Sequence, residues 1–126
     1  MRKTDSDYCL FCEPENTQEH KIIAENDKAF ARWDNFPVTT GHLEVVPKRH
    51  VVSFFGITAD ELHALHGLLN VAKDTVDDMY APDAYNIGIN DGVAAGRTVH
   101  HLHVHLIPRY EGDVDDPSGG FRNMLS

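Results

Sequence analysis

The stretch HHLHVHLIPR, residues 100–109, decides how this chain folds, because histidine recurs at every second position of an apolar segment. Branched apolar residues such as Val104 favour the pleated, half-buried backbone of a strand. Side chains two residues apart in a strand point to the same face of the sheet. We therefore expect His101, His103 and His105 to stand in one row on one face.

Other strands are predicted upstream of this stretch. Runs of apolar and β-branched residues bounded by turn-forming residues are typical of strands. Including the histidine segment, the predicted strands are residues 21–26, 29–35, 41–50, 84–91 and 98–108. The first two form a hairpin around the turn-forming run 25–27. Pro47 limits the third strand, because proline cannot donate to a sheet ladder.

One long helix is predicted over residues 59–79, ending before Pro82. Thr58 is a good N-cap, Glu61 follows with the spacing of a capping box, and apolar residues then recur at three- and four-residue steps. One helix is too few for a doubly wound parallel sheet. We therefore predict an α+β fold: an antiparallel sheet of about five strands with one long helix packed on it.

Composition limits the class of protein. The chain has 126 residues, 41% hydrophobic and 25% charged, which indicates a single globular domain over residues 1–126 with an irregular C-terminal tail at 111–126. The formal net charge of −9 argues against an extended nucleic-acid surface, so a nucleotide partner should be small. No apolar run has the length of a signal peptide or membrane span, which favours a cytoplasmic protein without a membrane partner. An exposed sheet edge would favour pairing with a second copy.

The histidine row has three possible uses: metal ligands, a proton relay, or a nucleophile flanked by groups that orient it. A neutral imidazole can attack phosphorus to form a labile phosphoramidate, and the central residue, His103, is best placed to do so. The loop 90–98 brings Asn90, Arg97, Thr98 and flexible glycines beside the row. Such groups suit anionic oxygens, so phosphate is the expected ligand.

Cys9 and Cys12 are the only cysteines and are spaced as Cys-x-x-Cys. A disulfide is disfavoured in a cytoplasmic protein, and the strand–helix–strand setting of a thioredoxin-like pair is missing. Metal binding is the remaining strong possibility. A tetrahedral zinc site needs two more donors, which His20, His50 and His101 could supply.

The segment NDGVAAGRTVHHLHVHLIPRYEGD, residues 90–113, strongly resembles the histidine-triad (HIT) family, whose signature is His-x-His-x-His followed by apolar residues. The resemblance extends through CLFC at 9–12, WDNFPVTTGH at 33–42 and GHLEVVPKRH at 41–50, so it covers most of the chain. It implies an α+β domain, generally a homodimer, that hydrolyses or transfers nucleotidyl groups at the α-phosphate.

The resemblance also implies roles for single residues. His103 corresponds to the nucleophile, His101 and His105 to the flanking histidines, and His42 to a further histidine behind them. Asp34 corresponds to the carboxylate that holds the ribose hydroxyls. Residues implied to contact phosphate or the surroundings of the nucleophile are Asn90, Gly96 and Thr98.

Arg97 departs from the family pattern, because relatives with the AGxTV pattern usually carry glutamine there. Arginine can still bind a phosphate oxygen with full charge, but it cannot accept a hydrogen bond as an amide oxygen does. Arg97 could therefore bind phosphate more tightly, and it could slow or alter the hydrolytic step. The resemblance does not imply the full catalytic rate of the family for this chain.

The resemblance selects the metal ligands as well. Relatives with an N-terminal Cys-x-x-Cys, and the related galactose-1-phosphate uridylyltransferases, use the two cysteines, a histidine after Pro-Lys and the first histidine of the triad. The implied ligands are therefore Cys9, Cys12, His50 and His101. Such a zinc ion has a closed shell and a structural role, and it ties the N-terminal segment 1–20, a zinc knuckle, to the catalytic strand.

Together these features predict a nucleotide hydrolase or nucleotidyl transferase that acts through a covalent nucleotidyl-histidine. Its substrates would be dinucleoside polyphosphates or nucleoside phosphoramidates, and AGRTVHHLHVHLIPRYEGD is nearer the branch resembling dinucleoside polyphosphate hydrolases. Two alternatives stay open: a nucleotide-binding sensor or scaffold with little turnover, and a catalytic metal bound by the histidine row. Three aromatic residues are predicted as core or as the lining of a base pocket, with core favoured, namely Phe30, Trp33 and Phe36. Three histidines are predicted as ordinary surface residues, namely His63, His66 and His100.

Overall fold

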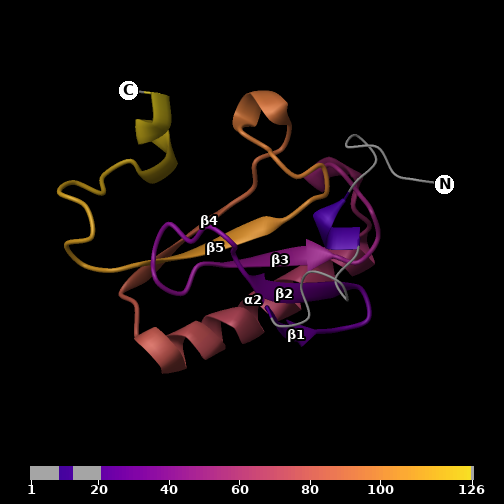
Figure 1. Ribbon diagram of the computed structural model, residues 1–126, viewed down its shortest axis with the longest axis horizontal. Coiled ribbons are helices and arrows are strands. Elements are labelled where there is room, and N and C mark those ends of the chain that lie inside the picture. Colours follow the sequence, from indigo (N-terminus) through magenta and orange to yellow (C-terminus); the bar gives the residue numbers. More distant parts are fainter. Residues whose placement is uncertain (1–8, 13–20, 126) are drawn as a thin grey trace.

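Five short strands form one antiparallel sheet, and a single long helix packs on it (Figure 1). The computed structural model describes residues 9–12 and 21–125. The strands are β1 (Ile22–Glu25), β2 (Ala29–Trp33), β3 (Leu43–Pro47), β4 (Ala84–Gly88) and β5 (Val104–Arg109). Their order across the sheet is β1-β2-β3-β5-β4, and every neighbouring pair is antiparallel. The predicted α+β class is confirmed.

The helix α2 (Ala59–Tyr80) begins and ends within one residue of its predicted bounds. The Thr58 side chain accepts from the Glu61 backbone N–H, and the Glu61 carboxylate accepts from the Thr58 backbone N–H, so the capping box is complete. The helix buries its apolar stripe against one face of the sheet. The core between them includes Leu65, Leu68, Ala72 and Val76 of the helix and Ala31, Leu43, Val45 and Leu106 of the strands.

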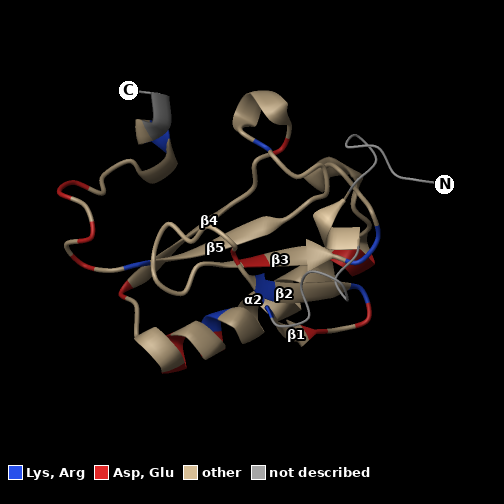
Figure 2. Ribbon diagram, viewed as in Figure 1, with Lys and Arg blue, Asp and Glu red and all other residues tan. Residues whose placement is uncertain are grey.

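The other face of the sheet carries both apolar and charged residues. Residues two apart along β2 and β3 share this face. Phe30 and Val46 form an apolar half, which Phe11 of the short 3-10 helix Leu10–Cys12 covers. Arg32 and Glu44 form a charged half next to it. In Figure 2 these appear as a blue segment in β2 and a red segment in β3, whereas most other charges lie outside the sheet. This face holds the candidate site.

The last strand is shorter than predicted. We expected it to begin at residue 98, but β5 begins at Val104 because β3 ends at Pro47 and pairs with β5 only as far as Val45. Before that point the chain bends, and the Leu102 N–H donates to the Val51 carbonyl outside the ladder. Of the predicted histidine row, only His105 therefore lies in a strand.

The two ends of the chain lie outside the sheet and the long helix. Of the predicted N-terminal segment 1–20, only residues 9–12 are described, and His20 lies outside the described residues. The C-terminal segment runs through turns into a short 3-10 helix, Gly120–Leu125. Within the described residues, no helix combines the length and the apolar character needed to cross a membrane.

Candidate functional site

A cavity of about 280 Å³ lies over the sheet face that α2 does not cover. Its lining unites residues that are distant in the sequence. From the predicted site it includes Asp34, His42, Asn90, Thr98, His103 and His105. Further lining residues are Leu10, Phe11, Asn35, Phe36, Val38, Glu44 and Val99. His101 is buried, and neither it nor Gly96 nor Arg97 is among the lining residues.

His103 is held in one tautomer. Its Nδ1–H donates to the carbonyl oxygen of His101 at 2.8 Å, so in the neutral ring Nε2 is the nitrogen with a free lone pair. Burial lowers the pKa of His103, and the nearby charges of Arg32 and Arg97 act in the same direction. The ring is therefore neutral near pH 7, which is the form of imidazole that can act as a nucleophile.

His105 is held in the opposite tautomer by a chain of hydrogen bonds. The Val38 backbone N–H donates to Nδ1 of His42, which leaves the proton of the neutral His42 ring on Nε2. His42 Nε2 lies 2.9 Å from His105 Nδ1 and donates to it. The remaining proton of His105 is thus on Nε2. Burial lowers the pKa of His105 to about 4, so this ring is neutral and offers one N–H donor.

Asp34 supplies a carboxylate at the edge of the cavity. Its Oδ1 accepts from the Phe36 backbone N–H at 2.8 Å, and its Oδ2 lies 3.5 Å from His42 Nε2. Burial by itself would raise the pKa of Asp34, but this backbone bond and a side-chain hydrogen bond with Glu44 act against it, and the pKa is lowered. Asp34 is therefore an ionised acceptor, suited to hydroxyl donors.

Glu44 and Arg32 are site residues that the sequence analysis missed. Glu44 lines the cavity and is 4% exposed, and its Oε1 lies 3.6 Å from Nε of the fully buried Arg32. Burial raises the pKa of Glu44 to about 8, the charge of Asp34 acts in the same direction, and Arg32 opposes both. The sequence does contain a signal for this pair. Arg32 and Glu44 each stand within a short apolar strand, and a charged residue buried there needs a partner.

Replacing Glu44 by glutamine should change how stability depends on pH. Since the folded-state pKa is raised above its ordinary value of 4.5, protonated Glu44 stabilises the fold fully below about pH 4.5, and this contribution is lost as the pH rises towards 8. We expect the free energy of unfolding of Glu44→Gln to rise above that of the wild type as the pH increases from 5 to 9, by up to a few kcal/mol. Denaturant unfolding at several pH values measures this, with the exposed Glu25→Gln as control. A pH-independent difference would contradict the assignment.

The loop between β4 and β5 brings two of its predicted residues into the cavity lining, Asn90 and Thr98. Gly96 lies behind them with φ of +99°, in the left-handed region that favours glycine. Nε of Arg97 donates to His100 Nδ1 at 3.1 Å, so its guanidinium is directed to a neighbour in its own loop. Its charge still acts on His103 by lowering the pKa of that ring.

A second group of donors lies beside the cavity: Cys9, Cys12, His50 and His101. Neither cysteine forms a disulfide, and both sulfur atoms approach Nδ1 of His101, at 3.2 Å from Cys9 and 3.5 Å from Cys12. Cys12 Sγ also lies 3.0 Å from Nδ1 of His50. His101 Nε2–H donates to the Pro47 carbonyl at 2.7 Å, which leaves Nδ1 unprotonated. These four donors can hold a metal ion.

The aromatic residues divide between core and cavity. Phe30 is buried and Trp33 packs against the core, as predicted. Phe36 is 84% exposed and lines the cavity, so of its two predicted places the favoured one, the core, is wrong and the pocket lining is the one observed. It follows the end of β2, where the alternation of buried and exposed side chains no longer applies. His63, His66 and His100 are exposed, as predicted.

Comparison with known proteins identifies the family. The model of the HIT domain matches residues 15–112. An uncharacterised HIT-like protein from Mycoplasma genitalium is 35% identical over 112 residues, which are 88% of this chain and 79% of that protein. A bis(5′-nucleosyl)-tetraphosphatase (asymmetrical) from Schizosaccharomyces pombe is 39% identical over 80 residues, 64% of this chain and 44% of that protein.

The fold comparison agrees. The crystal structure of a hypothetical histidine triad nucleotide-binding protein from Sulfolobus tokodaii has a TM-score of 0.75 and 33% sequence identity, covering 86% of this chain and 73% of that one. Sequence and fold therefore lead to one conclusion: the chain belongs to the HIT domain family.

Proposed function

We propose that this protein is a nucleotide hydrolase or nucleotidyl transferase that acts at an α-phosphate through a covalent nucleotidyl-His103. The observation that carries the proposal is the bond from His103 Nδ1–H to the His101 carbonyl, which leaves a neutral ring with an unprotonated Nε2 in the lining of a cavity. An oriented neutral imidazole is a competent nucleophile towards phosphorus.

The reaction has two steps. His103 Nε2 donates its electron pair to the α-phosphorus and forms an N–P bond, while the bond from phosphorus to the leaving group breaks and its electron pair departs with that group. The Nε2–H of His105 is available to donate a hydrogen bond to a phosphate or leaving-group oxygen. In the second step water attacks phosphorus, the N–P bond breaks and its electron pair returns to His103 Nε2, and a proton of the water is released to solvent. The products are a nucleoside monophosphate and the neutral His103; another acceptor in place of water gives transfer.

The other lining residues would hold the nucleotide. Ionised Asp34 would accept hydrogen bonds from the ribose hydroxyls, and Asn90 and Thr98 would donate to phosphate oxygens. Gly96 would keep the backbone clear behind Asn90. Arg97 would have to leave His100 to reach a phosphate directly. We favour dinucleoside polyphosphates over nucleoside phosphoramidates, which the similarity to a bis(5′-nucleosyl)-tetraphosphatase supports.

We further propose that Cys9, Cys12, His50 and His101 bind one structural zinc ion. The donor set is suitable: two thiols and two imidazoles approach one another at 3.0–3.5 Å, and His101 turns an unprotonated nitrogen towards the sulfurs. The Pro47 carbonyl orients His101 from the other side of its ring. Zinc in this position cross-links the N-terminal segment to the chain beside His103, and the four ligands leave no open position for water activation.

The proposal includes a cytoplasmic homodimer. Strand β4 lies at one edge of the sheet, and Ile87 on it is 54% exposed, so the edge is open to a second copy. A reducing compartment suits two cysteines that form no disulfide and serve as metal ligands. A sedimentation mass of one chain would contradict the homodimer.

Product analysis tests the proposed activity. The purified protein is incubated with adenosine and guanosine polyphosphates, dinucleoside polyphosphates and phosphoramidates, and the products are identified by mass. We expect a nucleoside monophosphate from at least one class, with oxygen from solvent water in the new phosphate group. Tight binding of one substrate class without any product would favour a nucleotide sensor or scaffold.

Arg97 is the residue that keeps the sensor hypothesis open. An arginine cannot supply the amide oxygen that glutamine would offer here, and its charge lies close enough to act on His103. We expect Arg97→Gln to raise turnover several-fold, because it restores an acceptor and removes a cation near the nucleophile. Steady-state kcat measures this effect, with His100→Gln controlling for loss of the Arg97–His100 bond. An unchanged kcat would mean that the substitution does not attenuate the enzyme.

A further inference from the structure

Glu44 is an acidic side chain in the lining of the cavity at the histidines. It lies in a cross-strand row, where it pairs with Arg32 of β2 on one side and with His105 of β5 on the other. One carboxylate oxygen of Glu44, one ring nitrogen of His103 and one of His105 lie within 4.8 Å of one another. The Glu44 carboxyl group is therefore close to the nitrogen at which the N–P bond would form.

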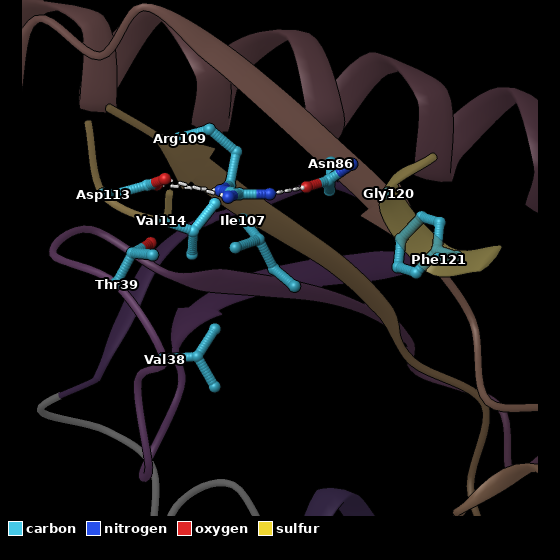
Figure 3. Close-up of a pocket in the computed structure, with 9 residues that line it drawn as sticks. All are labelled: Val38, Thr39, Asn86, Ile107, Arg109, Asp113, Val114, Gly120 and Phe121. Carbon is cyan, nitrogen blue, oxygen red and sulfur yellow. Dashed lines mark hydrogen bonds and ion pairs between the residues drawn. The ribbon is translucent and has the colours of Figure 1, made fainter. Parts of the chain in front are cut away.

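The arginine next to Glu44 does not keep it ionised. A closely paired carboxylate behaves differently: in a second cavity, of about 360 Å³, Arg109 donates hydrogen bonds of 2.8 and 2.9 Å to Asp113 and lowers the pKa of Asp113 to about 2 (Figure 3). Nε of Arg32, in contrast, donates to the Trp33 carbonyl and lies 3.6 Å from Glu44. Burial therefore prevails at Glu44 and raises its pKa to about 8, so this side chain holds a proton at neutral pH.

Within the described part of the cavity lining, Glu44 is the only side chain with an acidic proton at pH 7. Asp34 is ionised there. Burial lowers the pKa values of His42 and His105, and the N–H of a neutral imidazole is a very weak acid. His103 is reserved for the bond to phosphorus. The other lining residues carry only amide, hydroxyl or hydrocarbon side chains.

We propose that Glu44 is the general acid and general base of the reaction: it gives its proton to the leaving group when the N–P bond forms and takes a proton from water when that bond breaks. The inference rests on the proposed function and adds a catalytic residue to it.

The proton returns to Glu44 in each cycle. In the first step the O–H bond of Glu44 breaks, and the proton goes to the leaving-group atom that loses its bond to phosphorus. His103 keeps its Nδ1–H and becomes a cationic phosphoryl-imidazolium, while Glu44 becomes an anion. These opposite charges form close together and attract each other. In the second step the Glu44 carboxylate takes the proton that water would otherwise release to solvent, and the electron pair of the N–P bond returns to His103.

The proton of Glu44 matters most when the leaving group is strongly basic. An alkylamine cannot leave phosphorus without a proton, whereas p-nitrophenolate can. Two substrates with the same adenosine 5′-phosphoryl group therefore report separately on the proton transfer: an alkylamine phosphoramidate, which needs it, and a p-nitrophenyl ester, which does not.

Rapid quenching measures the rate at which nucleotidyl-His103 forms from each substrate. We expect Glu44→Gln to slow adduct formation about a hundred-fold from the phosphoramidate, because the proton donor is lost, and to leave the rate from the ester nearly unchanged. Glutamine matches glutamate in size and removes a buried charge, so this variant is expected to fold. Glu25→Gln, an exposed substitution on β1, is the control and should match the wild type with both substrates.

The pH dependence supplies a second readout. Since Glu44 must be protonated to act first, adduct formation from the phosphoramidate should fall in the wild type as the pH rises above about 8. This fall should be absent in Glu44→Gln. The charged and titratable side chains around Glu44 are Lys21, Arg32, Asp34, His42, His103 and His105. The variant retains all of them, so a fall that persists in Glu44→Gln would belong to one of them and would contradict the inference.

The outcomes separate this inference from the proposed function. If the wild type forms the adduct but Glu44→Gln slows both substrates by the same factor, or slows neither, Glu44 transfers no proton although the covalent mechanism stands. If the wild type forms neither adduct nor product from either substrate, the proposed function fails and the inference fails with it.

Discussion

Replacing His103 by alanine should abolish nucleotide turnover, with a loss in kcat of at least about a thousand-fold and no covalent nucleotidyl-protein. The reason is that no other histidine in the described part of the cavity lining can form the N–P bond. His105 Nδ1 is occupied by His42 and its Nε2 carries a proton, and His101 is buried and directed towards the cysteines. Among the described residues that line the cavity, only His103 has an unprotonated Nε2.

The measurement is rapid quenching of the wild type with labelled substrate, followed by mass analysis of the intact protein and its peptides. The adduct should be stable in alkali and labile in acid, as a phosphoramidate is, and should map to His103. His63→Ala is the matched control, since His63 is an exposed histidine on α2 far from the cavity lining. An adduct on another residue, or undiminished turnover in His103→Ala, would contradict a covalent mechanism through His103.

Removing the metal should produce the second large effect, a fall in thermal stability. If the four-donor group binds zinc, the ion stabilises the folded state by about 4 kcal/mol when its free concentration is about 1,000 times Kd. For a chain of this size that corresponds to a fall in Tm of more than about 10 °C. Chelation of the wild type and the substitution Cys12→Ser should lower Tm to a similar value. Cys12 is chosen because it is exposed, whereas Cys9 is part of a buried apolar cluster.

Elemental analysis supplies the independent measurement. The wild type should contain one zinc per chain and Cys12→Ser much less, and chelation should not lower the Tm of Cys12→Ser further. If the wild type binds no metal and its Tm is indifferent to chelation, the two cysteines and two histidines form only a hydrogen-bonded cluster. More than one tightly bound metal per chain would instead favour the reading in which the histidine row holds a catalytic ion.

The helix and the sheet could be predicted from the sequence because short-range sequence patterns specify them. Thr58 and Glu61 place the start of α2 through bonds made within one turn, and the apolar spacing specifies which stripe is buried. The start of the last strand could not be predicted in the same way. Its start depends on where β3 ends, and Pro47 lies more than fifty residues away in the chain.

The sequence by itself determined the type of site, since an alternating histidine segment, a Cys-x-x-Cys pair and a glycine-rich loop each have few chemical uses. Only the tertiary structure decided how the imidazoles differ. The His101 carbonyl accepts a hydrogen bond from Nδ1–H of His103, whereas the Val38 N–H, through His42, leaves the proton of His105 on Nε2. The buried Arg32–Glu44 pair was likewise visible only once β2 and β3 lay side by side. The physical reason is that a tautomer, a raised pKa or a cavity depends on groups brought together across the sheet, and no local pattern encodes that juxtaposition.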